Sequence, residues 1–332
     1  MITSSAVAAP TVRRLQLTEV ERDALGRLVD AFTATDRTAD PLSFAERLPA
    51  YAVRLPERMR EFLGQVRADE APVSVISGLP LQALPPTPLD WTAAAAGVGR
   101  REELLLVLCG LPLGEPFGWA AQQGGRLVHD VCPSPTMEQS LTSACSASPL
   151  SLHTEDGFHP CRGDYVALLC LRNPDAVRTT FVRLGSLGLP DKLQKILQDS
   201  RFRFLPDDAH VGGACAERLR ADPDGTGLGP IIFGPREHPY LRFDADFTAV
   251  SDGDDEAAAA MADLDERLSA ATESIALAPG DLLFIDNYQV VHGRASFRAR
   301  YDGTDRWLKR LNLIRDLRRI YATADTRSRI IR

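Results

Sequence analysis

The sequence predicts a mainly β fold, a sandwich or jelly roll buttressed by helices, and three observations support this prediction. Helical periodicity fills the first hundred residues. From Gly110 onward, Gly, Pro and Ser become frequent, and short apolar runs replace the long periodic segments. Strands and helices do not alternate regularly, and no GxGxxG motif follows a predicted strand, which argues against a dinucleotide-binding sheet.

Three helices are predicted in an N-terminal layer that spans residues 15–109. The first begins at a capping box, in which Thr18 and Glu21 are spaced to cap each other's backbone. The second covers residues 56–69, with a proline at its start, and the third covers residues 91–109. The apolar residues that follow the capping box at helical spacing are Leu25, Leu28, Val29 and Phe32.

Short strands dominate residues 110–320, which we assign to the jelly-roll core. The run YVALLCL at 165–171 is typical of a buried strand, and residues 306–314 alternate as a strand does. We expect one domain over residues 1–332, with a lid and the helix 254–272 inserted into the core. The other predicted elements are a helix at 190–199 and short strands at 231–233, 240–243 and 282–285.

Composition excludes several classes of protein. The formal net charge of −7 argues against a nucleic-acid partner, which would favour a basic face. No apolar run reaches the length of a membrane span, and the N-terminus lacks the pattern of a signal peptide, so we expect neither. The six cysteines form no CxxC pair and are typical of a reducing compartment, so we expect a cytoplasmic protein. The sequence makes no prediction of the oligomeric state.

The strongest local pattern is the segment LHTED at 152–156. In an extended chain, His153 and Glu155 project from the same face. One imidazole and one carboxylate on a common face are two of the three ligands of a 2-His-1-carboxylate iron site. Taken alone, a His-x-Glu pattern occurs often by chance, and a single histidine is more often a core or surface residue.

A third ligand must come from elsewhere, and the chain has only six histidines. His292 is the candidate, because it lies in the run PGDLLFIDNYQVVHGR at 279–294. This run predicts a turn and a buried apolar strand, followed by an imidazole near a strand end.

Two arginines follow His292 and share one face of the predicted strand 306–314. Arg306 and Arg310 are four positions apart, an even offset, so their guanidinium groups project from the same face of the strand. Neighbouring cations are costly unless each has an anion, and arginine binds carboxylates in a bidentate manner. Two small molecules that carry carboxylates would satisfy both.

These segments resemble the clavaminate synthase-like iron(II)/2-oxoglutarate-dependent oxygenases. The resemblance rests on SLHTEDGFHP, DYVALLCLRNPD, PGDLLFIDNYQVVHGR and the spacing to Arg306 and Arg310. Within the family, the chain looks most like the arginine and asparagine β-hydroxylases of peptide-antibiotic pathways. The resemblance covers about residues 110–320, and Gly157 stands where alanine is commoner in the motif.

The resemblance implies a double-stranded β-helix core and names the binding residues. His153, Glu155 and His292 would hold iron(II), which works with 2-oxoglutarate and O2. The distal carboxylate of 2-oxoglutarate would bind Arg306 and a hydroxyl from the RTTF segment, with Thr180 favoured and Thr179 nearly as good. The α-carboxylate of an amino-acid substrate would bind Arg310, and its α-amino group would face Gln122 or Gln123.

Asp244 and Asp246 are the candidates for the substrate side chain. The arginine hydroxylases that this sequence resembles carry an Asp-x-Asp at this place that binds the guanidinium group. A pair of carboxylates suits that planar cation well, although a solvated acidic turn is the plainer interpretation. Asp207 and Asp208 would then lie on a lid over the same cavity.

The other histidines receive ordinary structural interpretations. His159 is a minor candidate for a residue beside the metal ligands, and Asp156 points to the opposite strand face from Glu155, so it is not counted as a ligand. The remaining histidines, which we expect in structural or surface positions, are His129, His210 and His238.

The predicted function is hydroxylation of an unactivated carbon, C3, of a free L-amino acid, L-arginine or a related guanidino amino acid. Hydroxylation at C4 and 4,5-desaturation use the same site and remain alternatives. Two readings from other classes are a zinc hydrolase with a His2Glu site and a non-catalytic jelly-roll binding module. The absence of HExxH argues against the first, and the complete ligand set argues against the second.

Overall fold

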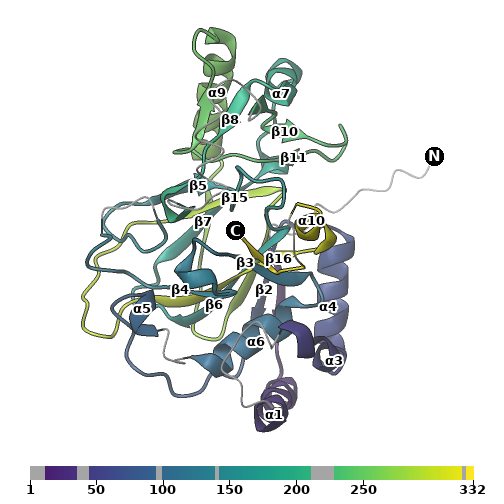
Figure 1. Ribbon diagram of the computed structural model, residues 1–332, viewed down its shortest axis with the longest axis vertical. Helices are drawn as coiled ribbons and strands as arrows, with labels where there is room; N and C mark the ends of the chain where they lie inside the picture. Colours follow the sequence, from purple (N-terminus) through teal and green to yellow (C-terminus); the bar gives the residue numbers. More distant parts are fainter. Residues whose placement is uncertain (1–11, 36–44, 95–98, 139–141, 211–227, 324–326) are drawn as a thin grey trace, which may run out of the picture.

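Two β-sheets face each other at the centre of the computed structural model, which describes residues 12–35, 45–94, 99–138, 142–210, 228–323 and 327–332 (Figure 1). The large sheet has the order β1-β2-β14-β6-β16-β3-β17, with β4 also paired to β16, and the small sheet has the order β13-β7-β15-β5. The strands of the large sheet are β1 (Arg13–Gln16), β2 (Val73–Ser77), β3 (Glu115–Trp119), β4 (Val128–Val131), β6 (Tyr165–Arg172), β14 (Leu282–Asp286), β16 (Trp307–Ile314) and β17 (Ile330–Ile331). The strands of the small sheet are β5 (Leu150–His153), β7 (Arg178–Arg183), β13 (Glu273–Ala276) and β15 (Val290–Arg294).

The chain passes back and forth between the sheets, which confirms the jelly roll. Strands β5, β7, β13 and β15 belong to the small sheet, while β6, β14 and β16 belong to the large one. The continuous apolar run of β6 has a structural reason, because both faces of this strand are covered. Val166, Leu168 and Cys170 pack between the sheets, and the alternate residues pack toward the helices.

The helical layer covers the outer face of the large sheet, and the predicted apolar stripes face inward. Helix α1 (Glu19–Thr35) buries the four residues that the spacing singled out, and α4 (Glu57–Ala68) matches the second prediction. The capping box is formed, since the Thr18 amide donates to Glu21 over 2.8 Å and the Glu21 amide donates to Thr18 Oγ1 over 3.3 Å. The other helices of this layer are α3 (Pro49–Ala52), α5 (Trp91–Ala94) and α6 (Arg100–Gly110).

The expectations for the N-terminal layer need two corrections. The helix expected at 91–109 is described as α5 and α6, with residues 95–98 outside the described part of the chain. Residues 15–109 are also not wholly helical, because β2 joins the large sheet antiparallel to β14 and β1 pairs in parallel with β2. Strand β2 escaped notice because it is short and buried on both faces, so its sequence VSVIS does not alternate in polarity.

A group of elements inserted between β7 and β13 projects from the body of the molecule (Figure 1). The predicted helix at 254–272 is α9 (Asp255–Ala270), whose first turn is capped when Asp254 accepts a hydrogen bond of 3.1 Å from the Ala257 amide. Its apolar residues share one hydrophobic cluster with β7 and β15, so the insertion is anchored to the core. The other elements of the insertion are η2 (Leu184–Ser186), α7 (Asp191–Gln198), β8 (Phe202–Phe204), η3 (Asp208–His210), β9 (Leu228–Gly229), β10 (Ile232–Phe233), β11 (Tyr240–Leu241) and β12 (Thr248–Val250). Two short elements lie elsewhere in the chain, the 3-10 turn η1 (Gln123–Gly125) and helix α10 (Arg318–Tyr321).

Among the described residues, no helix combines the length and apolar character needed to cross a bilayer.

The close approach of β5 to β15 depends on Gly293. These strands pair antiparallel with a local irregularity at Gly293, and a Cβ atom at this position would lie 2.4 Å from the Leu150 carbonyl oxygen. Any side chain at position 293 must therefore push the two strands apart. Since β5 carries His153 and β15 carries His292, the spacing of these strands matters for the candidate metal site.

Gly293→Ala should lower the free energy of unfolding by about 1–3 kcal/mol, because the methyl group overlaps a backbone carbonyl that cannot move aside. Gly64→Ala is the matched control, since Gly64 is exposed in α4 with open space around it, and it should gain about 0.5–1 kcal/mol. Chemical denaturation of both variants measures the difference. A Gly293→Ala protein as stable as the wild type would contradict this account of the strand spacing.

Candidate active site

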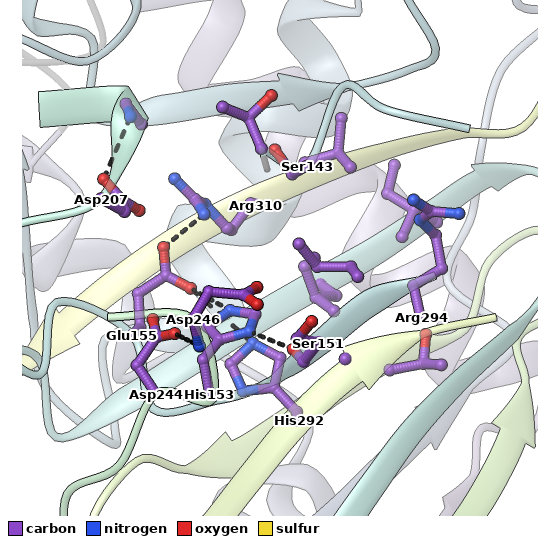
Figure 2. Close-up of a pocket in the computed structure, with 18 of the residues that line it drawn as sticks. Ser143, Ser151, His153, Glu155, Asp207, Asp244, Asp246, His292, Arg294 and Arg310 are labelled. Carbon is purple, nitrogen blue, oxygen red and sulfur yellow. Dashed lines mark hydrogen bonds and ion pairs between the residues drawn. The ribbon is translucent and has the colours of Figure 1, made fainter. Parts of the chain in front are cut away.

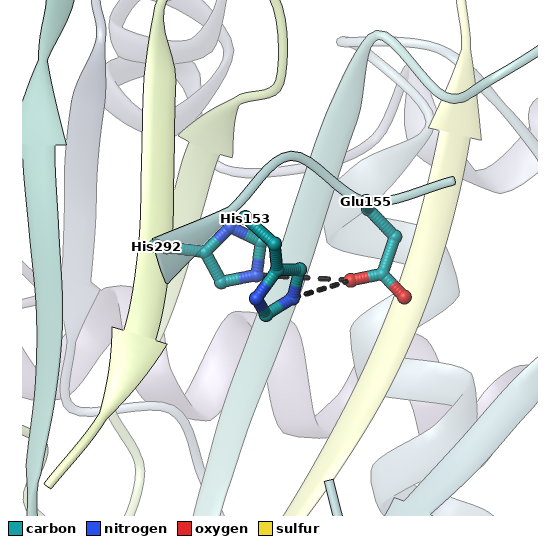
Figure 3. Close-up of side chains that lie close together, drawn as sticks. All are labelled: His153, Glu155 and His292. Carbon is teal, nitrogen blue, oxygen red and sulfur yellow. Dashed lines mark ion pairs between the residues drawn. The ribbon is translucent and has the colours of Figure 1, made fainter. Parts of the chain in front are cut away.

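Three side chains from two distant segments of the chain meet at the end of the small sheet (Figure 3). His153 ends β5 and pairs in register with His292 on β15, and Glu155 follows two residues after His153. Glu155 Oε2 lies 3.7 Å from Nε2 of each histidine. One ligand atom from each of the three residues falls within 4.8 Å of the others. The structure thus brings together the three residues that the sequence proposed as metal ligands.

Glu155 is held in place by Asn287, a fully buried residue in the turn between β14 and β15. The Asn287 side chain accepts a hydrogen bond of 2.7 Å from the Glu155 amide and donates one of 2.9 Å to the Glu155 carbonyl oxygen. It also donates to the Gly163 carbonyl oxygen over 2.9 Å. One amide side chain therefore fixes the backbone from which the carboxylate projects.

The electrostatics of the triad favour a bound divalent cation. Burial disfavours the charge on Glu155, but Arg310 and the two histidines outweigh burial and hold its pKa below the usual range. Burial also acts against a charged His153, yet Glu155 raises the pKa of His153 to about 9. Burial and the neighbouring His153 lower the pKa of His292 to about 3. The negative charge of Glu155 thus favours a positive charge beside it, which a bound divalent cation would supply.

The donor set fits iron(II). Glu155 Oε2 is buried and has no hydrogen-bond partner among the described residues, although it faces both imidazoles. The Nδ1 atom of His153 lies 2.8 Å from the Ser151 carbonyl oxygen, which orients its Nε2 toward the carboxylate. Two imidazoles and one carboxylate on a single side, with the other side open to a cavity, are the ligands of non-heme iron(II) oxygenases.

A cavity of about 90 Å³ opens beside the triad (Figure 2). Arg310, Glu155, Asp244 and Asp246 gather around the histidines, whereas Arg294 lies toward the opposite end of the cavity. The cavity is therefore lined by charges of both signs. This arrangement suits ligands that carry more than one charged group.

Arg306, which directly precedes β16, and Arg310 within β16 both line this cavity, on the common face that the alternation predicted. Arg306 is buried, its Nη2 lies 3.4 Å from Thr179 Oγ1, and its Nε has no partner among the described residues. Burial, with a contribution from Arg294, lowers the pKa of Arg306 to about 10, which leaves the guanidinium charged at neutral pH. A buried cation of this kind needs an anion.

Of the two candidate threonines, the structure favours Thr179 over Thr180 as the hydroxyl beside Arg306. Thr179 lines the cavity beside Arg306, whereas Thr180 does not line it and pairs with Gly293 in the register of β7 and β15. Adjacent residues of a strand face opposite sides of the sheet, so only one of the pair can face the cavity. The sequence did not reveal which side of β7 faces inward.

Arg310 is held by three neighbours, and Gln122 is one of them. Its Nη1 forms an ion pair with Glu155, and its Nη2 donates to Gln122 Oε1 over 3.1 Å and to His129 Nδ1 over 2.9 Å. Gln122 lines the cavity, but Gln123 does not, because its amide bonds the backbone of Asp130 at 2.9 and 3.0 Å. Gln123 is thus a structural residue of the turn before β4, and the prediction that included it needs this correction.

Asp244 and Asp246 both line the cavity, although they are not extended as the i, i+2 argument assumed. Asp244 forms an isolated bridge with His153, and its Oδ1 accepts from the Asp246 amide over 2.9 Å and the Phe247 amide over 3.1 Å. The chain therefore turns after Asp244 and presents both carboxylates to the cavity. Burial raises the pKa of Asp244, and a cationic partner would favour its charged form.

A buried polar network behind the cavity was not anticipated. Asp156 accepts hydrogen bonds from Trp119 Nε1 over 2.7 Å and from Asn312 Nδ2 over 3.2 Å, and it lies 3.3 Å from His210 Nε2. Burial raises the pKa of Asp156 to about 7. Asp156 lies outside the group formed by His153, Glu155 and His292. His210, which we took for a structural or surface residue, bridges Asp156 to the cavity-lining Asp207.

The other histidines and the acidic residue considered from the sequence lie away from the three candidate metal ligands or outside the described part of the chain. His159 accepts from the Cys161 amide over 3.0 Å and meets the Trp119 ring edge to face, and the exposed His238 lies near Glu70. The side chain of Asp208 lies outside the described part of the structure. No local pattern pointed to His129 or His210, because their roles depend on which strands lie beside them.

Comparison with known proteins shows what the chain is similar to. The family model "Taurine catabolism dioxygenase TauD, TfdA family" matches residues 213–312. Enduracididine beta-hydroxylase from Streptomyces hygroscopicus is 39% identical over 87% of this chain and 94% of that protein. Clavaminate synthase 2 from Streptomyces clavuligerus is 32% identical over 89% of this chain and 90% of that protein. The crystal structure of the non-heme iron oxygenase OrfP with Fe, succinate and (3S)-hydroxy-L-Arg is 37% identical, covers 96% of this chain and 99% of OrfP, and has a TM-score of 0.90.

Asn287→Ala should weaken iron(II) binding roughly 10- to 100-fold, because the Glu155 backbone loses two hydrogen bonds and the side-chain link from it to the Gly163 carbonyl oxygen is removed. Calorimetric titration of the anaerobic protein with the metal measures the change. Asn173→Ala is the matched control, since the buried Asn173 also forms three backbone hydrogen bonds, with Val177 and Leu277, away from the triad. Both variants should lose stability, and equal metal affinities in the two would refute the role given to Asn287.

Proposed function

This chain belongs to the clavaminate synthase-like iron(II)/2-oxoglutarate-dependent oxygenases, and from that premise we propose that it hydroxylates C3 of free L-arginine. The observation that carries the substrate proposal is the pair Asp244 and Asp246 in the cavity that Arg310 also lines. One end of such a substrate is an α-carboxylate and the other is a guanidinium group. The OrfP complex with (3S)-hydroxy-L-Arg supports the choice of substrate and carbon.

The metal and the cosubstrate have defined partners in this proposal. His153, Glu155 and His292 hold iron(II), and Arg306 with Thr179 holds the distal carboxylate of 2-oxoglutarate. When bound, the metal with 2-oxoglutarate and O2 supplies the oxidising power that breaks an unactivated C–H bond. The protein binds and orients the substrate and excludes water from the reacting centre. Burial of Arg306 makes its interaction with a carboxylate strong, since little water competes for the guanidinium.

The amino acid is oriented by contacts at both ends. Arg310 takes the α-carboxylate, and Gln122 Oε1 is an acceptor for the α-amino group. Asp244 and Asp246 take the guanidinium group, whose charge offsets the cost of burying the Asp244 carboxylate. Contacts at both ends leave little freedom along the side chain, and this restriction selects the carbon that reacts.

A cyclised guanidino amino acid is the second candidate substrate. The similarity to enduracididine beta-hydroxylase supports this candidate. Like L-arginine, a cyclised guanidino amino acid would offer a guanidinium group to Asp244 and Asp246. Hydroxylation at C4 and 4,5-desaturation remain alternative outcomes at the same site. We propose that the protein acts in the cytoplasm, which the free buried cysteines among the described residues support.

The substrate proposal is tested by succinate release from a panel of free amino acids. L-Arginine should release more succinate than L-lysine or L-asparagine, and Asp244→Asn should remove most of that preference, because the guanidinium loses a charged partner. Product mass separates the outcomes, since hydroxylation adds one oxygen atom and desaturation removes two hydrogen atoms. Equal succinate release from all three amino acids would overturn the role of the aspartates, and an arginine product without added oxygen would overturn hydroxylation.

Substitutions of Arg306 and Arg310 should raise the KM of different substrates. Arg306→Ala should raise the KM for 2-oxoglutarate by at least about tenfold, because a charge-assisted pair is worth roughly 1.5–3 kcal/mol. Arg310→Ala should instead raise the KM for the amino acid. Steady-state kinetics with each substrate varied in turn distinguishes the two. The opposite pattern would exchange the two assignments.

A further inference from the structure

Arg310 is bordered by a histidine that no part of the proposed function uses. Strand β4 pairs with β16 so that His129 stands directly opposite Arg310 in register. His129 is buried, and its Nδ1 lies 2.9 Å from Arg310 Nη2. On the other side of the ring, Nε2 lies 2.9 Å from the Arg126 carbonyl oxygen.

These two partners determine which ring nitrogen carries the proton. A carbonyl oxygen only accepts hydrogen bonds, so Nε2 of His129 must carry a hydrogen and donate it to Arg126. A guanidinium nitrogen only donates, so Nδ1 must be bare and accept from Arg310. Burial and the charge of Arg310 lower the pKa of His129 to about 3, which agrees with an imidazole that stays neutral.

We propose that His129 is a positioning residue whose neutral Nδ1 holds the Arg310 guanidinium in the orientation that receives the substrate's α-carboxylate. The inference rests on the proposed function, because it takes the role of Arg310 from there. His129 and Gln122 together occupy both hydrogens of Nη2, and Glu155 occupies one of Nη1. Arg310 Nε has no partner among the described residues.

The three contacts prevent the guanidinium plane from rotating. Rotation would leave the buried Nη2 hydrogens without acceptors, and an unpaired buried donor is costly. Glu155 alone cannot supply this restraint, because a single contact at Nη1 leaves the plane free to turn about it. The acceptor on His129 therefore sets the direction in which the remaining N–H groups point.

Two substitutions separate this role from a purely structural one, since each keeps one of the two contacts. His129→Gln can still reach the Arg126 carbonyl oxygen with its amide nitrogen, but it places no acceptor at the Nδ1 position. His129→Asn places its amide oxygen where Nδ1 was, but it is too short to reach Arg126. His238→Gln makes the same substitution at an exposed histidine and is the control for the effect of replacing histidine by glutamine.

The test measures the Kd of L-arginine and of 2-oxoglutarate by calorimetry on the anaerobic, iron-loaded protein. His129→Gln should weaken L-arginine binding about tenfold or more, the size of a hydrogen bond to a charged group, and leave 2-oxoglutarate binding unchanged. His129→Asn should retain L-arginine affinity within about threefold of wild type, whereas a structural role through Arg126 predicts the reverse order. His129→Gln with wild-type affinity, or a parallel loss of 2-oxoglutarate binding, would overturn the proposal.

A second measurement does not depend on the substrate. Nitrogen-15 NMR of the metal-free protein should show His129 as the neutral tautomer with hydrogen on Nε2, with the resonances assigned by their loss in His129→Gln. A charged ring, or hydrogen on Nδ1, would refute the positioning role. If wild-type protein failed to consume L-arginine while this tautomer was observed, the proposed substrate would be wrong and the contact with Arg310 would stand.

Discussion

The carboxylate of Glu155 connects the two halves of the site, because its two oxygens face different partners. Oε2 lies 3.7 Å from Nε2 of His153 and of His292, while Oε1 forms the ion pair with Arg310. A metal bound at the histidines and a guanidinium on β16 are therefore neighbours of one buried anion. Any displacement of Glu155 would disturb both, and Asn287 opposes such a displacement with two hydrogen bonds to the Glu155 backbone and a third to the Gly163 carbonyl oxygen.

The jelly roll brings these parts together through strand pairing rather than through loops. The register of β5 with β15 sets the two histidines side by side, and the segment after Leu241 adds to the free edge of β5. In that segment, the Thr154 amide donates to Phe243 over 2.7 Å and the Ala245 amide donates to Leu152 over 3.1 Å. The aspartate that faces the cavity is thus fixed to the strand that carries the first metal ligand. Sites built on paired strands hold their geometry more tightly than sites on free loops.

Residues that act within one local pattern could be predicted from the sequence, and residues that act through a distant strand could not. His153, Glu155 and the two arginines of β16 were found because alternation along a strand places them on one face. The same rule could not decide between Thr179 and Thr180, because the sequence of β7 alone does not show which face of the strand lies toward the cavity. His129 and His210 depend on tertiary neighbours, Arg310 in one case and Asp156 in the other. No spacing within the chain reveals such pairings.

The charges that line the cavity offer a final argument about the substrate. Three arginines, Arg294, Arg306 and Arg310, face four carboxylates, so the lining carries a formal excess of one negative charge with neutral histidines. Iron(II) and the dianion of 2-oxoglutarate cancel each other, so they leave this excess in place. A zwitterionic amino acid with an uncharged side chain would also leave this excess in place. An amino acid whose side chain carries one positive charge removes it, and among such side chains a planar guanidinium can engage two carboxylates at once.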